Sequence, residues 1–221
     1  MKNLSNIENL PVSSQVFESI LRGIQNLHLP PGTRMSETDV GAQLGVSRQP
    51  VRDAFGRLSL AGYLDIKPQR ATRIAKISDQ RLRDAVFLRA SLECASLAER
   101  EPLSQNQIKE LSEIVEKMRH SVSNQETEYF DLLDNEFHQT LTNIKSRPAI
   151  WTIIRDAHGH VGRLQSLSRQ NLRDADWQQH QDILDAVISG RLDRTIPLLK
   201  THLEQVLGTI DRVKEENPAY F

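Results

Sequence analysis

The sequence predicts a mainly α-helical protein: an N-terminal winged helix-turn-helix, made of three helices and a small β-hairpin, followed by an all-α antiparallel helical bundle. Three observations predict this. Apolar residues recur at helical spacing along most of the chain. The LPPG cluster at 29–32 separates the first helical run from two shorter ones. The stretch 63–75 has the pattern of a short hairpin. We expect domains at 1–77 and 78–221.

Composition favours a globular protein that meets an anion at one end. The 221 residues are 38% hydrophobic and 26% charged, with a net charge of -1. Residues 1–77 carry 10 Lys and Arg against 6 Asp and Glu, whereas residues 78–221 carry 18 against 23. The single Cys94 excludes an internal disulfide. With no signal-type segment and no apolar run of about 20 residues, we expect a soluble cytoplasmic protein without membrane contact.

The first domain has clear helix boundaries. Ser13 or Ser14 is expected to cap the first helix, Ser36 the second and Ser47 the third. Gly45 and Gly62 follow the second and third helices, as C-terminal glycines commonly do. Pro50 falls in the first turn of the third helix, where its missing N–H costs nothing. These signals give two helices joined by a tight turn.

The third helix carries cations where a helix disfavours them. In GVSRQPVRDAF (45–55), Arg48, Gln49 and Arg52 lie opposite the apolar stripe, near the positive end of the helix dipole. A DNA ligand explains them, because arginine pairs with guanine or phosphate and glutamine with adenine in the major groove. Arg70 and Arg73 in the hairpin can reach an adjacent groove or phosphate. The alternative is a solvated polar face on an ordinary three-helix unit.

The sequence of the second domain predicts helices throughout. Apolar residues keep helical spacing through about 80–100, 105–122, 127–144, 148–168, 174–189 and 192–214, with breakers or polar gaps between these runs. We expect two copies of the chain to pair through this domain as a homodimer, so that their third helices read a pseudo-palindromic operator in double-stranded DNA.

Three histidines and one carboxylate in the second domain could hold a metal. Asp134 and His138 are four residues apart, on one face of a helix, while His180 and His202 lie beside the apolar stripes of two other helices. Their convergence inside a bundle would suit a divalent transition metal, with Zn²⁺, Ni²⁺ and Mn²⁺ all possible. The alternative is that these histidines are structural or solvated.

The first domain resembles the DNA-binding domain of the GntR family of bacterial transcription regulators. The stretch PPGTRMSETDVGAQLGVSRQPVRDAFGRLSLAGYLDIKPQR carries the resemblance, with LGVSR-x-PVR-x-A at its centre. The resemblance implies that DNA-contacting positions are filled by Thr38, Arg48, Gln49, Arg52 and Arg70. Members usually have glycine after the wing-tip arginine, and this sequence has Ala71 there. Alanine would hold the wing further from a minor groove.

The second domain is similar to the FCD sensor domain of the fatty-acid-regulator-like (FadR-like) subfamily. Arg89, Leu92 and Glu93 form its RxxLE pattern, and Asp-x-x-x-His, His-x-x-Ile/Leu and His-Leu follow in order. The resemblance implies that a metal is bound by Asp134, His138, His180 and His202, and that a small carboxylate effector docks on it. Arg89 and Arg163 are the candidates for holding the effector carboxylate, because arginine offers a bidentate fork.

Together these features predict a DNA-binding transcription regulator, expected to be a repressor, that responds to a carboxylate effector and is not an enzyme. One alternative is a metal-dependent hydrolase or isomerase fused to a DNA-binding domain, since three histidines and an aspartate can activate water. Glu136 points away from the face of Asp134 and His138, which leaves no clear general base. Another alternative is a nucleoid-type protein without an effector, which would bind DNA without sequence preference.

Overall fold

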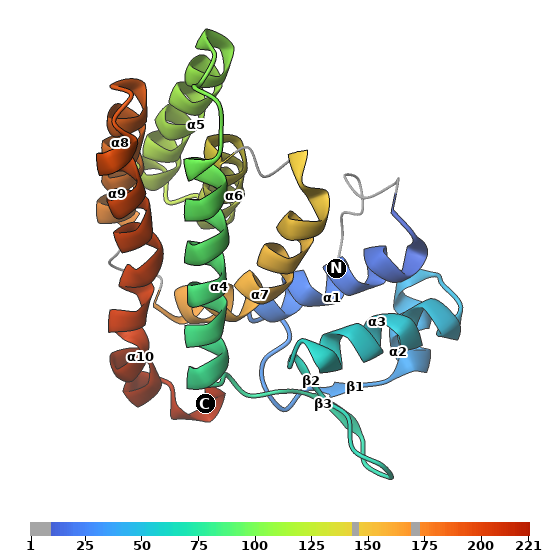
Figure 1. The fold of residues 1–221 in the computed structure, drawn as a ribbon. Coiled ribbons are helices and arrows are strands. Elements are labelled where there is room, and N and C mark those ends of the chain that lie inside the picture. The colour runs from blue at the N-terminus through green and yellow to red at the C-terminus, as the bar shows by residue number, and fades with distance from the viewer. Residues whose placement is uncertain (1–9, 143–145, 169–172) are drawn as a thin grey trace. The chain divides into compact units, whose positions relative to one another are not determined.

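The computed structural model describes residues 10–142, 146–168 and 173–221, and they form helices with one small sheet, which confirms the predicted fold class (Figure 1). None of the described helices is both long and apolar enough to cross a bilayer. The elements are α1 (Val12–Gln25), β1 (Arg34–Met35), α2 (Glu37–Leu44), α3 (Arg48–Leu60), β2 (Leu64–Asp65), β3 (Thr72–Ile74), α4 (Asp79–Ala98), α5 (Gln105–Ser123), α6 (Thr127–Thr142), α7 (Pro148–Leu167), α8 (Arg173–Ile188), α9 (Leu192–Glu204), α10 (Ile210–Glu216) and 3-10 turns at Gln205–Thr209 and Pro218–Tyr220.

The chain divides into two compact units that do not follow simple chain order. The first unit combines Met1–Arg83 with Asp156–Leu167 and Ile210–Phe221. The second unit combines Asp84–Arg155 with Ser168–Thr209. The expected domains at 1–77 and 78–221 stay a prediction about which parts fold on their own. In the structure, the end of α7 and all of α10 pack with the N-terminal elements.

The first unit packs α1, α2 and α3 over a three-stranded antiparallel sheet of order β1-β3-β2. Its core is apolar and includes Phe17, Ile20, Val51, Leu58 and Tyr63, each fully buried. The expected hairpin is present as β2 and β3, with Leu64 paired to Ile74. The third strand, β1, was not expected; its Arg34 pairs with Arg73, far along the chain.

The boundaries of the first three helices follow local chemistry in part. Ser36 caps α2, its hydroxyl accepting from the backbone N–H of Asp39, and Gly45 ends α2 in the left-handed conformation at φ 69°. Ser47 occupies the N-cap of α3 but makes no side-chain capping bond. The expected capping of α1 by Ser13 or Ser14 is wrong. The helix begins at Val12, with Pro11 at the N-cap, because proline supplies a suitable extended conformation just before it.

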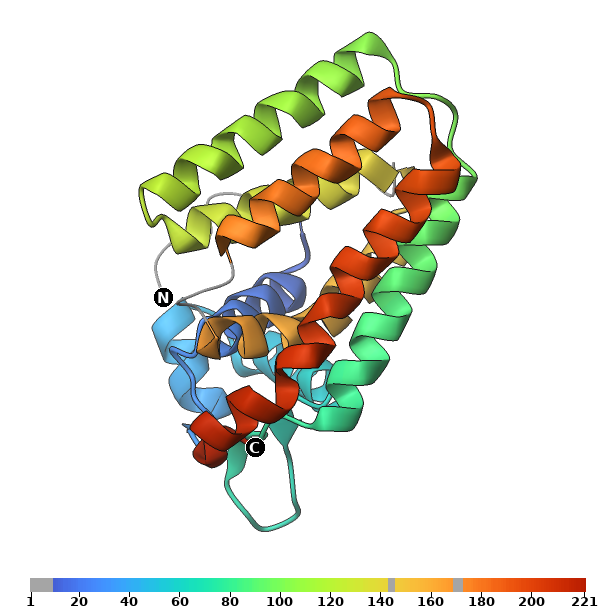
Figure 2. The ribbon, with the colours of Figure 1, turned by 90° about the vertical axis from the view of Figure 1, so that its left-hand side faces the viewer.

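The second unit is a set of helices, of which α5 packs against both α6 and α8, and α8 against α9 (Figure 2). Their buried core includes Leu111, Met118, Leu133, Phe137 and Leu199. The sequence pattern predicts one continuous helical run over 192–214. In the structure this run is divided into two helices, because a 3-10 turn at Gln205–Thr209 separates α9 from α10. Of the run 127–144, the last two residues lie outside the described part of the chain.

Candidate metal centre and nucleic-acid interface

Three helices of the second unit bring one carboxylate and three imidazoles to a common point. Asp134 and His138 come from α6, His180 from α8 and His202 from α9, and one ligand atom from each lies within 4.8 Å of the others. His138 and His180 are fully buried. The structure therefore brings together all four residues that the sequence singled out. That they bind a metal stays a prediction.

A phenylalanine holds two of these rings in place. Phe137, fully buried next to His138 in α6, meets the His138 ring edge-on at 5.6 Å and the His180 ring at 4.9 Å between centroids. Edge-to-face packing of this kind fixes ring planes as well as positions. Asp134 and His138 sit one helical turn apart, so both reach the same point without backbone distortion.

The outer nitrogen of each imidazole has a hydrogen-bond acceptor. His138 Nδ1 lies 2.7 Å from Glu93 Oε2, His180 Nδ1 2.7 Å from the Asp176 carbonyl oxygen, and His202 Nδ1 2.7 Å from Gln179 Oε1. A carbonyl or carboxylate oxygen can only accept, so each Nδ1 carries the proton. In a neutral ring the other nitrogen, Nε2, then presents a lone pair.

The Nε2 atoms of the three histidines and the Asp134 carboxylate lie at spacings that suit a bound cation and are unfavourable without one. His138 Nε2 lies 3.3 Å from His202 Nε2, and His180 Nε2 lies 3.1 Å from Asp134 Oδ1. For neutral rings with the proton on Nδ1, each of these two contacts brings electron pairs face to face, and a cation between them would relieve the repulsion. Metal–ligand bonds of about 2.0–2.2 Å would place neighbouring ligands about 3–3.5 Å apart. Three imidazoles and a carboxylate suit Zn²⁺, Ni²⁺ and Mn²⁺ alike.

The pKa values of His138, His202 and Asp134 are shifted in the direction that metal ligands need. Burial lowers the pKa of His138, and it lowers the pKa of His202 well below the usual range, with the neighbouring histidines adding to the effect. Burial alone would raise the pKa of Asp134, but His138, the hydrogen-bonding contact with His180 and the Arg89 guanidinium bring it well below normal. Neutral imidazoles and an ionised carboxylate are the forms that bind metals.

The two candidate effector arginines are both buried. Arg89 donates from Nε to Glu93 Oε1 at 2.6 Å, and its Nη2 lies 3.5 Å from Asp134 Oδ2, so it bridges two carboxylates of the second unit. Arg163 lies in the first unit, where Nη2 donates to the Ala75 carbonyl at 2.7 Å. Its Nε and Nη1 have no hydrogen-bond partner among the described residues. Their effector role stays a prediction.

On α3 the structure supplies an anion for the arginines in the helix's first turns. Arg52 makes two bonds to Glu37, at 3.1 and 3.3 Å, and Arg48 lies 3.5 Å from the same carboxylate. Gln49 donates to Asp53 at 2.8 Å. The side chains of Arg48 and Arg52 are 65% and 59% exposed, so their guanidinium groups remain open to a ligand.

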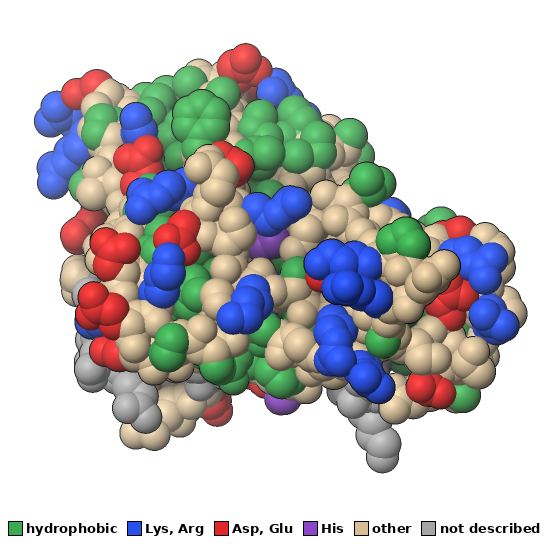
Figure 3. Space-filling model, turned by 90° about the horizontal axis from the view of Figure 1, so that it is seen from below, with side chains coloured by type: hydrophobic (Ala, Val, Ile, Leu, Met, Phe, Trp, Pro, Cys, Tyr) green, Lys and Arg blue, Asp and Glu red, His purple; other side chains and the backbone are tan. Residues whose placement is uncertain are grey.

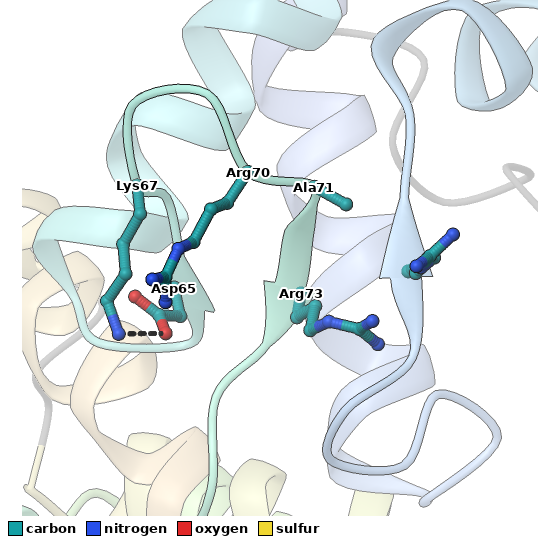
Figure 4. A pocket seen from close by; sticks show the side chains of 6 residues that line it. Asp65, Lys67, Arg70, Ala71 and Arg73 are labelled. Atoms are coloured by element: carbon teal, nitrogen blue, oxygen red, sulfur yellow. Dashed lines mark ion pairs between the residues drawn. The ribbon is translucent and has the colours of Figure 1, made fainter.

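Cations also surround the hairpin. A hollow of about 290 Å³ is lined by Arg34, Asp65, Lys67, Arg70, Ala71 and Arg73 (Figure 4). Lys67 pairs with Asp65 at 2.9 Å, and Arg70 points toward this pair. Arg73 points the other way, toward β1, and donates to the Gly32 carbonyl. Lys and Arg side chains gather around the hairpin on this face (Figure 3).

Sequence reasoning missed four residues of these two sites. Arg34 joins the basic hollow only through the pairing of β1 with β3, which no local pattern announces. Lys67 stands in the hairpin loop, where its charge was the only signal. Glu93 belongs to the RxxLE pattern, but that pattern does not indicate a contact with His138. No sequence pattern indicates that Gln179 contacts His202.

Comparison with known proteins gives the family of each part. Residues 12–74 match the model described as bacterial regulatory proteins, gntR family, and residues 84–205 match the FCD domain. The chain is 30% identical over 215 residues to the HTH-type transcriptional repressor RspR of Escherichia coli K12, covering 96% of this chain and 94% of that protein.

Two solved structures share the fold. A putative GntR transcriptional regulator from Rhodococcus sp. RHA1 superposes with a TM-score of 0.73 at 21% identity, covering 90% of this chain and 97% of the other. McbR/YncC of E. coli gives a TM-score of 0.74 at 19% identity, covering 94% and 99%. At these identities the likeness concerns the fold alone.

Proposed function

This chain is a transcription regulator that belongs to the GntR family of bacterial regulatory proteins and carries an FCD domain, and we propose that it is a repressor whose operator affinity is set by a metal-bound carboxylate. The metal would be a divalent transition ion held by Asp134, His138, His180 and His202. The observation that carries this proposal is the cluster of four electron-pair donors within 4.8 Å.

At the DNA, α3 would enter the major groove of a pseudo-palindromic operator, with two chains paired through their C-terminal domains. Its N-terminal side chains would meet base edges, while the hairpin cations would meet phosphates. Glu37 holds Arg48 and Arg52 in the free protein, so DNA must compete with it for both guanidinium groups. We propose as contacts the residues Thr38, Arg48, Gln49, Arg52, Arg70 and Arg73, with Arg34 added from the structure.

The charge of the buried cluster favours an anionic effector. Arg89 is positive, and Glu93 and Asp134 are negative, so a divalent ion would leave this group with one excess positive charge. A buried charge without a partner is costly. A carboxylate ligand would neutralise it, and the metal would supply a Lewis-acid site for the carboxylate oxygen. Arg89 and Arg163 are our candidates to orient that effector.

Effector binding would act by changing the population of DNA-competent conformations. Linkage requires that an effector which weakens DNA binding is itself bound more weakly when the operator is present, by the same factor. The residues of this chain would hold the metal and orient the carboxylate, and they need perform no chemistry on it.

A thermal-shift experiment tests the proposal. Protein purified without chelator is heated alone, with EDTA, and with a panel of small carboxylates, each with and without EDTA. Ligands that bind the native state raise the melting temperature, so we expect EDTA to lower it and one or more carboxylates to raise it only when metal is present. A carboxylate shift that survives EDTA would contradict a metal-bound effector. Turnover of a carboxylate would favour the enzyme alternative.

A further inference from the structure

Around the four proposed ligands lies an outer layer of hydrogen-bond acceptors. Glu93, from α4, is fully buried and places Oε2 2.7 Å from His138 Nδ1. Its other oxygen accepts from Arg89 Nε at 2.6 Å. Arg89 lies four residues before Glu93 on the same face of α4, and only 8% of its side chain is exposed. The carboxylate is therefore fixed from two sides.

A second series of hydrogen bonds runs from His202 through two glutamines and ends at the Asp176 carboxylate. Gln205 Nε2 donates to Asp176 Oδ1 at 2.9 Å, and Gln179 Nε2 donates to Gln205 Oε1 at 2.7 Å. Because a carboxylate can only accept, the direction of this relay fixes both amides. Gln179 Oε1 is then the atom that faces His202 Nδ1.

The same aspartate serves a second histidine. Its backbone carbonyl accepts from His180 Nδ1 at 2.7 Å, one helical turn away on α8. Asp176 thus fixes His180 through its backbone and His202 through the relay of two glutamines.

We infer that Glu93 and Gln179 are positioning residues, which lock the Nδ1–H tautomers of His138 and His202 and so preorganise the site for a divalent cation. A ring that is free to exchange tautomers would spend part of its time with the proton on Nε2. In that form Nε2 has no free electron pair and cannot bind the metal. Locked rings avoid that cost. The inference rests on the proposed metal site, and it adds which residues outside the ligand set determine its affinity.

The test measures Zn²⁺ affinity by competition with a fluorescent chelator. Gln179→Leu keeps the size of the side chain and removes the acceptor; Gln178→Leu, on the same helix but at an exposed surface bond to Asp182, is the matched control. We expect Gln179→Leu to weaken Zn²⁺ binding about 10–100-fold, as losses of outer hydrogen bonds do, and the control to stay within twofold. If the wild type, Gln179→Leu and Gln178→Leu bind Zn²⁺ with equal affinity, the inference is overturned.

Glu93→Gln tests the other acceptor while keeping its volume. We expect about tenfold weaker Zn²⁺ binding, since the charge that supports the His138 proton is lost. Because this change leaves Arg89 with one carboxylate fewer, circular dichroism of the metal-free variant checks that it folds. If it does not, Gln179→Leu alone decides the inference.

Nitrogen-15 NMR of the metal-free protein separates positioning from a structural role. The wild type should show His138 and His202 with the proton on Nδ1. Gln179→Leu should turn His202 into a tautomer mixture and leave His138 unchanged. A His202 ring that keeps its Nδ1–H in this variant would contradict the inference. Failure of the wild type to bind Zn²⁺ would instead refute the metal proposal, and the NMR result would still judge the tautomer lock.

Discussion

Gly159 in α7 lies where the structure leaves no room for a side chain. A Cβ built there would stand 2.5 Å from Tyr63 Oη, 2.8 Å from Leu21 Cδ1 and 3.0 Å from Tyr63 Cζ. Tyr63 has little freedom to retreat. It is fully buried, its hydroxyl donates to the Asp156 carbonyl at 2.6 Å, and its ring stacks on His160 at 4.2 Å.

Gly159→Ala should therefore destabilise the protein. Overpacking of a tight core costs about 1–3 kcal/mol, and disturbing the tyrosine hydroxyl bond adds about 1 kcal/mol. Alanine gains about 1 kcal/mol over glycine in a helix. The net loss is about 1–3 kcal/mol of unfolding free energy.

Gly162→Ala, one turn later in the same helix, is the matched control. Its Cβ would meet Gln25 at 3.5–3.8 Å, which is ordinary contact, so only the helix gain of about 1 kcal/mol should remain. Urea unfolding followed by circular dichroism measures both variants. The two variants should differ by about 2–4 kcal/mol, so with a slope of about 2 kcal/mol per molar urea their midpoints should differ by about 1–2 M. If Gly159→Ala is as stable as Gly162→Ala, the packing argument is refuted.

Four further outcomes are expected. Arg52→Ala should weaken operator binding by about 1–3 kcal/mol in an anisotropy titration, and unchanged affinity would remove Arg52 from the contacts. His180→Ala should abolish most of the metal content measured by elemental analysis, whereas full occupancy would exclude this ligand. Gly56→Ala meets no atom within 4 Å, so it should gain about 1 kcal/mol of stability; a loss would show crowding at this face. Burial lowers the pKa of His160 to about 4 from 6.5, so as pH falls through this window the unfolded chain takes up the proton first, and the unfolding free energy should fall by up to about 3 kcal/mol. Urea melts at pH 7, 5.5 and 4.5 should show a flatter dependence in His160→Gln, and identical slopes would contradict this.

The helices of this protein could be predicted because their signals are local. Ser36 and Gly45 define the ends of α2 through bonds and backbone angles within a few residues. The strand β1 could not be predicted in this way, because Arg34 is a strand residue only through Arg73, which lies 39 positions later.

The metal cluster shows the same division. Asp134 and His138 follow from helical spacing, but His180 and His202 become their neighbours only when α6, α8 and α9 pack together. Resemblance to a known family supplied what spacing could not. It did not supply the partners of Arg89, whose position between two carboxylates depends on the packing of α4 against α6.

The first unit draws on three separate stretches of chain, and this constrains how genes for such proteins can recombine. A crossover near residue 77 would transfer Tyr63 and Ala75 without Asp156 and Arg163, whose bonds to them close the unit. It would also separate Ile77 from Tyr220, which are joined by a backbone bond at 2.8 Å. Chimeras of this protein should therefore carry 156–167 and 210–221 with the N-terminal part, and a simple exchange of halves should yield poorly folded hybrids.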